Sequence, residues 1–244
     1  MKRIAFLTTA VLLLFSCSGK TVQDKEDAQE GTPATPGLPV AVDLGLSVKW
    51  ANTNLGATAP EEYGDYYAWG EIENKKDFSW KSYKWAIIYP TYYSLSKYNY
   101  DGEYGTVDNK RVLDAADDTA HVKLGGKWRM PTRSEVDELV STSTNSSYKW
   151  EWKSLNGHPG WSVTYLAKNQ SVFFPAAGFK GEESAPFYVG EAGYYWSTAL
   201  YTGPLEGLGG QSPESAWHLN FFDDTIRPDY GSRQYGFSIR AVIE

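Results

Sequence analysis

The chain has 244 residues, and 41% of them are hydrophobic, which is enough to bury the core of one large domain or two small ones. Its formal net charge of -7 argues against a nucleic-acid partner, because proteins that bind nucleic acids usually carry a basic face. With a single cysteine, Cys17, the chain cannot form an internal disulfide framework. Aromatic residues make up 16% of the chain, and because Tyr and Trp suit both a core and a binding surface, we expect both uses.

The first residues of the chain have the pattern of an export signal. Two basic residues precede an apolar run, Ile4–Phe15, which is too short to span a membrane, since a span needs roughly 20 apolar residues. The ending Leu14-Phe15-Ser16-Cys17 resembles a bacterial lipobox, in which the cysteine is lipidated and becomes the new N-terminus. We therefore expect residues 1–17 to be a lipoprotein signal peptide, with palmitate on Cys17 holding the chain on a membrane. The alternative is an ordinary signal peptide whose apolar region contains a cysteine.

Residues 18–39 contain no aromatic side chain and are rich in charged residues, Gly, Pro, Thr and Gln, which predicts a disordered tether. Fully extended, this tether would reach roughly 70 Å at about 3.3 Å per residue. Its acidic stretch, Asp24–Glu30, resembles the signal that sends some Bacteroides-like lipoproteins to the outer face of the outer membrane. The expected location is therefore the outer membrane, with the domain exposed at the cell surface.

Residues 40–244 are predicted to form a single folded domain. The segments Val40–Trp50 and Tyr63–Gly70 are rich in β-branched or aromatic residues, so both are predicted to be strands. Residues 71–108 have many Lys, Tyr and Trp but no clean period, and we expect a long irregular excursion there.

Two helices are expected in the middle of the chain. The clearer one begins at Thr132, whose side chain can cap it, and Glu135 completes a capping box three residues later. Val136 starts an apolar stripe with i, i+3, i+4 spacing, and the helix should end within residues 141–147. A shorter helix is expected over Asn109–Val122.

Beyond residue 150 the pattern predicts strands and loops up to the end of the chain. Trp196 is expected in the core, whereas Arg240 alternates away from its apolar neighbours and is expected on a polar face. The fold class is therefore α+β, with two helices packed on a twisted, mainly antiparallel sheet and many loops. The expected strands are Ser171–Pro175, Tyr194–Thr198, Ala216–Phe222 and Gly236–Val242.

Several motifs, taken in order, resemble the Fibrobacter succinogenes major paralogous domain family. The resemblance spans roughly residues 42–244 and includes the N-terminal segment Val42–Glu71. It implies a C-type-lectin-like fold, which is similar to that of formylglycine-generating enzymes, in a family common among Bacteroides-type lipoproteins. Because this fold hosts enzymes, lectins and receptors, the resemblance alone does not define a function. The motifs are Gly126–Glu135, Tyr195–Thr198, Ala216–Trp217 and Tyr235–Val242.

We expect no enzymatic activity, no cofactor and no metal site. Formylglycine-generating enzymes bind copper through a cysteine pair, which this chain lacks, and the related iron enzymes need clustered histidines. The three histidines, His121, His158 and His218, stand far apart in the sequence, and no nucleophile elbow, phosphate loop or metal motif occurs. A glycosidase stays open, because it needs only two opposed carboxylates and acidic residues are plentiful.

The expected function is binding of a glycan or a protein ligand. Residues 201–215 form a Gly- and Pro-containing loop that is long enough to be functional, and in the resembled family the C-terminal region forms the ligand surface. The alternative is a structural or accessory lipoprotein of an envelope complex or pilus, and a third possibility is an enzyme of the formylglycine-generating type. The candidate ligand-binding residues are Tyr201 in the loop and, as exposed side chains, His218, Asn220, Asp223, Asp224, Arg227, Tyr230 and Arg233.

Overall fold

The computed structural model describes residues 37–183, 185–204 and 212–244. Cys17, most of the predicted tether and residues 205–211 of the predicted functional loop lie outside the described residues. Residues 34–244 form one compact unit. Within the described ranges, no helix is both long and apolar enough to cross a membrane.

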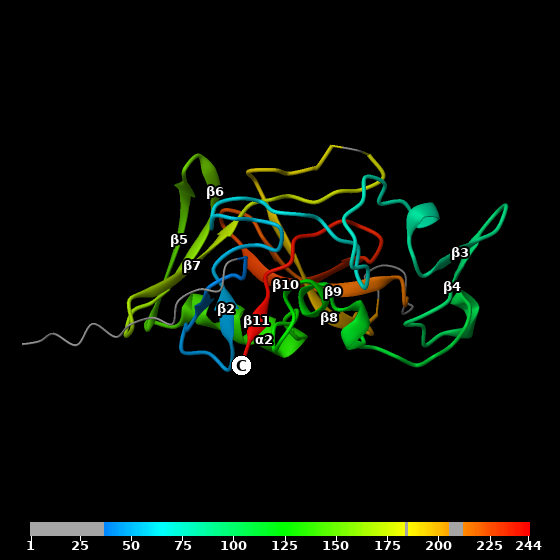
Figure 1. Ribbon diagram of the computed structural model, residues 1–244, viewed down its shortest axis with the longest axis horizontal. Coiled ribbons are helices and arrows are strands. Elements are labelled where there is room, and N and C mark those ends of the chain that lie inside the picture. Colours follow the sequence, from blue (N-terminus) through cyan, green and yellow to red (C-terminus); the bar gives the residue numbers. More distant parts are fainter. Residues whose placement is uncertain (1–36, 184, 205–211) are drawn as a thin grey trace, which may run out of the picture. The chain divides into compact units, whose positions relative to one another are not determined.

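The strands of the described residues pair antiparallel in three small sheets and one hairpin (Figure 1). The sheets have the strand orders β10-β9-β8, β5-β6-β7 and β1-β2-β11, and β3 pairs with β4. The predicted α+β class with mainly antiparallel pairing is confirmed. The strands are β1 Ala41–Val42, β2 Lys49–Ala51, β3 Ala86–Ile88, β4 Tyr93–Leu95, β5 Tyr148–Leu155, β6 His158–Tyr165, β7 Gln170–Pro175, β8 Gly193–Leu200, β9 Ser215–Phe221, β10 Ile226–Ser232 and β11 Val242–Ile243.

The two α-helices of the described residues are α1, Thr119–Leu124, and α2, Arg133–Ser141. The predicted capping box of α2 is confirmed, since Thr132 Oγ1 accepts from Glu135 N at 3.3 Å and the Glu135 carboxylate accepts from Thr132 N at 2.7 Å. Helix α2 packs against β8, β9 and β10. Short 3-10 helices cover Trp80–Ser82, Gly102–Tyr104, Ala115–Asp117 and Thr142–Thr144.

The helix predicted over Asn109–Val122 is wrong in extent, because its first half is extended. The Asp108 carboxylate accepts from Lys110 N, and Leu113 N donates to Thr198 O, so the backbone groups that a helix would need are engaged elsewhere. The helix begins only after Asp118, whose side chain accepts from His121 N at 3.0 Å. Tertiary pairing with β8 therefore overrides the local apolar spacing.

Three strand predictions also need correction. Tyr63–Gly70 forms no strand; it is an extended core segment with a single bridge from Tyr67 to Phe237. The C-terminal segment Gly236–Val242 makes isolated bridges, and regular pairing starts only at β11. Residues 71–108 were predicted to be irregular, but they contain the β3–β4 hairpin.

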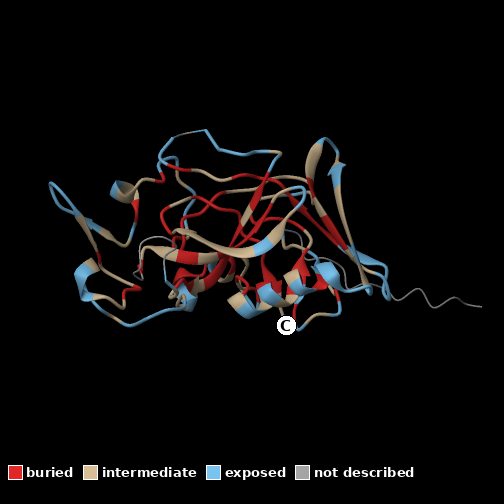
Figure 2. Ribbon diagram, turned by 180° about the vertical axis from the view of Figure 1, so that it is seen from behind, coloured by how far each residue is buried: buried red, intermediate tan, exposed pale blue. Residues whose placement is uncertain are grey.

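The core contains the aromatic residues that the motifs singled out. Trp196 is fully buried as predicted, its ring stacks on Phe237 with centroids 4.0 Å apart, and its Nε1 donates to Tyr67 O at 2.8 Å. In Figure 2 the buried residues fill the interior, whereas the tip of the β3–β4 hairpin is exposed. Hydrophobic burial around these rings is the main stabilising contribution to the fold.

Arg240 is fully buried, so the prediction that it lies on a polar face is wrong. Its guanidinium donates to Asn54 Oδ1 at 2.7 Å, to Ala51 O at 3.0 Å and to Phe173 O at 2.8 Å. A buried charge is tolerated where its donors are satisfied, and here one side chain ties together the backbones of β2 and β7.

Candidate functional site

The eight residues predicted to bind a ligand do not form one site. Asp223, Asp224 and Arg227 are exposed as predicted, and Tyr230 is half-buried. The predicted exposure of His218, Asn220 and Arg233 is wrong, because these side chains are buried. The side chain of Tyr201 is buried as well. The buried residues divide into three groups with different surroundings.

Arg233 holds three segments of the chain together. Its Nη1 donates to Tyr98 O at 2.8 Å and to Pro213 O at 2.9 Å, its Nη2 donates to Lys97 O at 2.8 Å, and its Nε donates to the Tyr83 hydroxyl at 2.9 Å. With its donors engaged and its side chain fully buried, Arg233 is a structural residue and is unable to reach a ligand.

His218 and Asn220 lie on the same face of β9. The His218 ring packs edge-on against Phe237 and Trp196, and burial lowers the pKa of His218 to about 4. Its Nδ1 has no hydrogen-bond partner among the described residues. Asn220 Nδ2 donates to Gly193 O at 3.3 Å. Near neutral pH the imidazole is therefore uncharged and part of the core.

Tyr201 and Tyr230 belong to a ring cluster on the opposite face of the sheet. Their rings stack 3.9 Å apart, and Trp217 meets Tyr201 edge-on at 4.8 Å. The Arg133 guanidinium lies 3.4 Å from the centre of the Trp217 ring, which joins α2 to this cluster. These contacts attach the helix to the sheet.

The exposed predicted residues stand beside an aromatic surface that the sequence analysis did not identify. Phe179 forms its centre, with ring centroids at 5.4 Å from Phe187, 6.2 Å from Tyr188 and 5.1 Å from Tyr194. Tyr188 in turn meets Phe222 at 6.4 Å. We name this surface the aromatic platform; it consists of Phe179, Phe187, Tyr188, Tyr194, Phe222 and Tyr235.

Tyr188 is the most exposed ring of the platform, at 51%. Its backbone has a φ of 55°, in the left-handed region that bulky side chains rarely adopt. The loop holds it there, because the Tyr188 carbonyl accepts from Glu191 N at 3.1 Å and from Ala192 N at 3.0 Å, and the Phe187 and Phe179 backbones hydrogen-bond to each other. Strained residues that the surrounding structure holds in place cluster at functional sites, and an exposed one has few contacts of its own to offset the strain.

Charged residues border the platform on one side. Arg227 pairs with Asp229 at 2.9 Å, and the strand register places both on the same sheet face as Tyr194. Asp223 and Asp224 follow Phe222 in the turn between β9 and β10. The platform thus has an apolar centre and a polar edge. The apolar triplet Phe187-Tyr188-Val189, set between Pro186 and Gly190, is the sequence signal that could have indicated it.

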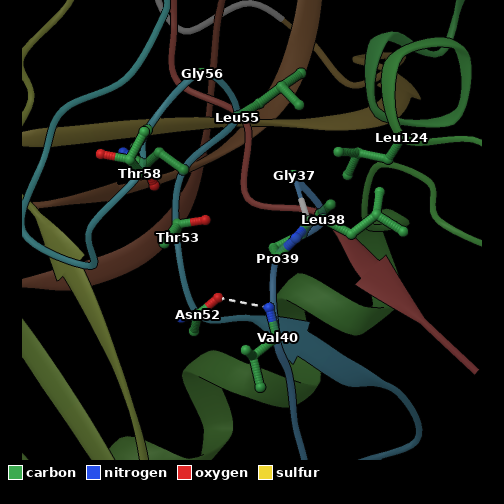
Figure 3. A pocket seen from close by; sticks show the side chains of 13 residues that line it. Gly37, Leu38, Pro39, Val40, Asn52, Thr53, Leu55, Gly56, Thr58 and Leu124 are labelled. Atoms are coloured by element: carbon green, nitrogen blue, oxygen red, sulfur yellow. Dashed lines mark hydrogen bonds between the residues drawn. The ribbon is translucent and has the colours of Figure 1, made fainter. Parts of the chain in front are cut away.

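A hollow of about 500 Å³ lies where the described chain begins (Figure 3). None of the described residues that line it is ionisable. Two of its polar groups are engaged within the fold: Val40 N donates to Asn52 Oδ1 at 2.7 Å, and the Thr58 hydroxyl donates to Glu62 at 2.9 Å. Without an ionisable or aromatic side chain among these residues, the hollow offers few groups for specific recognition.

Metal-binding residues do not gather in the described ranges. Within them, no group of three or more His, Cys, Asp or Glu side chains could hold an ion. His121 lies in α1, His158 begins β6 and His218 lies in β9.

Comparisons with protein-family models, with curated proteins and with solved structures found no match for this chain. The fold and the platform together define an α+β protein of mainly antiparallel strands with an exposed aromatic surface on its C-terminal half.

Proposed function

We propose that this chain is a surface-tethered, non-catalytic binding module and that a protein ligand binds on the aromatic platform. The proposal includes a C-type-lectin-like fold of the Fibrobacter major paralogous type and an outer-membrane anchor at Cys17. The observation that carries it is Tyr188, an exposed tyrosine that the loop holds in a strained conformation. Without a ligand, an exposed ring makes few stabilising contacts that would offset the backbone strain.

The composition of the platform supports a protein ligand. Tyr, Phe and Arg are enriched in protein interfaces, where an apolar centre is surrounded by a polar rim. Phe187 is 36% exposed and Val189 is 38% exposed beside Tyr188, and the charged side chains of Arg227 and Asp229 lie at the edge. A large exposed apolar patch on a protein often marks such an interface.

The test is binding of the full chain, purified in detergent, to an array of purified surface and matrix proteins. Tyr188→Ala combined with Arg227→Ala should weaken binding at least about tenfold, which is about 1.4 kcal/mol. Leu166→Ala is the matched control, because this apolar residue is 52% exposed outside the platform. Equal binding by both variants, or no protein bound by the wild type, contradicts the proposal; the second result favours the structural or accessory alternative.

The anchor has its own test. Cells that express the Cys17→Ser variant should no longer incorporate labelled palmitate into this chain, and the chain should leave the membrane fraction. Retention of label in the variant contradicts lipidation at Cys17 and favours another means of membrane attachment.

A further inference from the structure

A second exposed aromatic surface lies on the β3–β4 hairpin. From Trp85 to Ser96 the chain carries no charged side chain. The turn of the hairpin closes with Tyr89 N donating to Tyr92 O at 2.9 Å. Four large apolar side chains are displayed here: Ile87 and Ile88 are each 43% exposed, Tyr89 is 40% exposed and Tyr92 is 61% exposed. None of them belongs to the aromatic platform.

The hairpin forms one wall of a pocket of about 570 Å³, which we name the hairpin pocket. Two stacked ring pairs line it: Tyr89 lies on Tyr92 with centroids 4.5 Å apart and an interplanar angle of 13°, and Trp80 lies on Tyr93 at 4.5 Å and 16°. The pairs come from the hairpin and from the 3-10 helix at Trp80–Ser82. Ring stacking orders these side chains before any ligand arrives.

Charged side chains complete the lining of the hairpin pocket. Asp77 and Lys81 flank Trp80, and Glu182 comes from a distant loop. Asp77 Oδ1 accepts from Ser79 N at 2.8 Å, and this backbone hydrogen bond lowers the pKa of Asp77, so its carboxylate is charged at neutral pH. No described cation forms an ion pair with Glu182. The pocket therefore combines flat apolar rings with hydrogen-bond acceptors and one ammonium donor.

We propose that the hairpin pocket is a second binding site, independent of the platform, and that it takes a neutral glycan. A hexose ring has one apolar face of C–H groups, which packs on an aromatic ring, and a rim of hydroxyls, which donate to carboxylates. The rings of Tyr89 and Tyr92 would pack on the C–H face, and the carboxylates of Asp77 and Glu182 would accept from the hydroxyls. Because the pocket is lined by two carboxylates and only one lysine, it would repel uronic or other acidic sugars.

The carboxylates also argue against the main alternative occupant, a lipid surface. An uncharged turn rich in Tyr and Ile has the composition of a segment that inserts into the membrane interface. Insertion of this hairpin, however, would draw Asp77 and Glu182 toward the apolar layer, and dehydrating an unpaired carboxylate costs more than the burial of two tyrosines gains. A glycan hydroxyl satisfies the same carboxylates instead.

The test is titration of the full chain in detergent with three probes: a panel of soluble neutral polysaccharides, polygalacturonate as an acidic glycan, and phosphatidylethanolamine–phosphatidylglycerol vesicles. We expect at least one neutral polysaccharide to bind, with much weaker binding of polygalacturonate. Tyr92→Ala should weaken binding of the neutral glycan about tenfold or more. Glu182→Gln should weaken it several-fold and reduce the discrimination against the acidic probe.

Two controls separate this site from the platform and from a folding defect. Leu166→Ala and Tyr188→Ala should leave glycan binding unchanged, and Tyr92→Ala should keep the melting temperature of the wild type, because the ring is exposed. Loss of glycan binding in Tyr188→Ala would indicate that the glycan binds on the platform, and it would overturn the proposal. The absence of any glycan binding would overturn it too, as would vesicle binding that depends on Tyr92.

Discussion

Two tyrosines of this chain share a rare backbone conformation but lie in opposite surroundings. Tyr98 has a φ of 56° and Tyr188 a φ of 55°. Tyr98 is fully buried, and its hydroxyl donates to Asp117 at 2.7 Å and accepts from Asp114 N at 2.9 Å. Tyr188 is half exposed. The side-chain contacts of Tyr98 offset its backbone strain within the fold, whereas Tyr188 has far fewer such contacts, which is why we connect Tyr188 with binding.

The greatest loss of stability should come from a substitution in the buried region around Tyr98. Arg233→Met would leave four acceptors without their donor, three of them in buried hydrogen bonds that are each worth about 1–3 kcal/mol, so we expect the free energy of unfolding to fall by about 5 kcal/mol. Urea unfolding measures the change. Arg227→Met, at the exposed edge of the platform, should change stability by less than about 0.5 kcal/mol. A loss below about 1 kcal/mol for Arg233→Met would contradict the structural role of this residue.

The next effect is a pH dependence of stability that comes from His218 beneath the platform. Its pKa is about 4 in the folded protein against an ordinary value of 6.5, so between these values the unfolded chain binds more protons. Stability should therefore fall as the pH drops from 6.5 to 4, by about 3 kcal/mol in total. Asp229, Arg227 and Tyr194 are the ionisable groups that face this ring.

Replacement of the imidazole tests this prediction. His218→Leu should flatten the dependence of the unfolding free energy on pH within that window, as measured by urea unfolding at several pH values. Parallel curves for the variant and the wild type would show that other groups cause the dependence.

A matched pair of hydroxyl deletions compares the two tyrosines directly. Tyr98→Phe removes two hydrogen bonds, a buried one to the Asp117 carboxylate and a partly buried one from Asp114 N, and should cost about 2 kcal/mol of unfolding free energy. Tyr188→Phe should change it by less than about 0.5 kcal/mol, because the ring is half exposed. Equal losses for the two variants would show that Tyr188 also has a structural role.

Local signals predicted the parts of the fold that depend on local chemistry. The capping box of α2 lies where Thr132 and Glu135 indicated, because both hydrogen bonds form within one turn. The strand at Tyr194–Thr198 and the burial of Trp196 followed equally from alternation and aromatic content.

The alternation of polar and apolar residues did not predict which candidate site residues are exposed, because that rule assumes a sheet with one face in solvent. Helix α2 covers one face of β8–β10, and Phe179 and Phe237 cover much of the other, so polar residues of β9 such as His218 become buried. Arg233 and Arg240 are buried because distant carbonyls meet their donors, which no local pattern encodes. The sequence did not predict the platform for a similar reason, since its rings come from five separate segments of the chain.

If the strained Tyr188 loop is kept for binding, Tyr188→Gly should raise stability relative to a ringless variant that keeps the strain, and should still lose affinity. Glycine adopts positive φ without strain, whereas alanine keeps the strain and also lacks the ring, so Tyr188→Gly should unfold with a free energy about 1 kcal/mol higher than that of Tyr188→Ala. Its affinity for the array-identified protein ligand should nevertheless fall at least about tenfold. Tyr188→Gly no more stable than Tyr188→Ala would show that the loop is not strained, and Tyr188→Gly that binds the ligand as tightly as the wild type would show that the ring is not needed for binding.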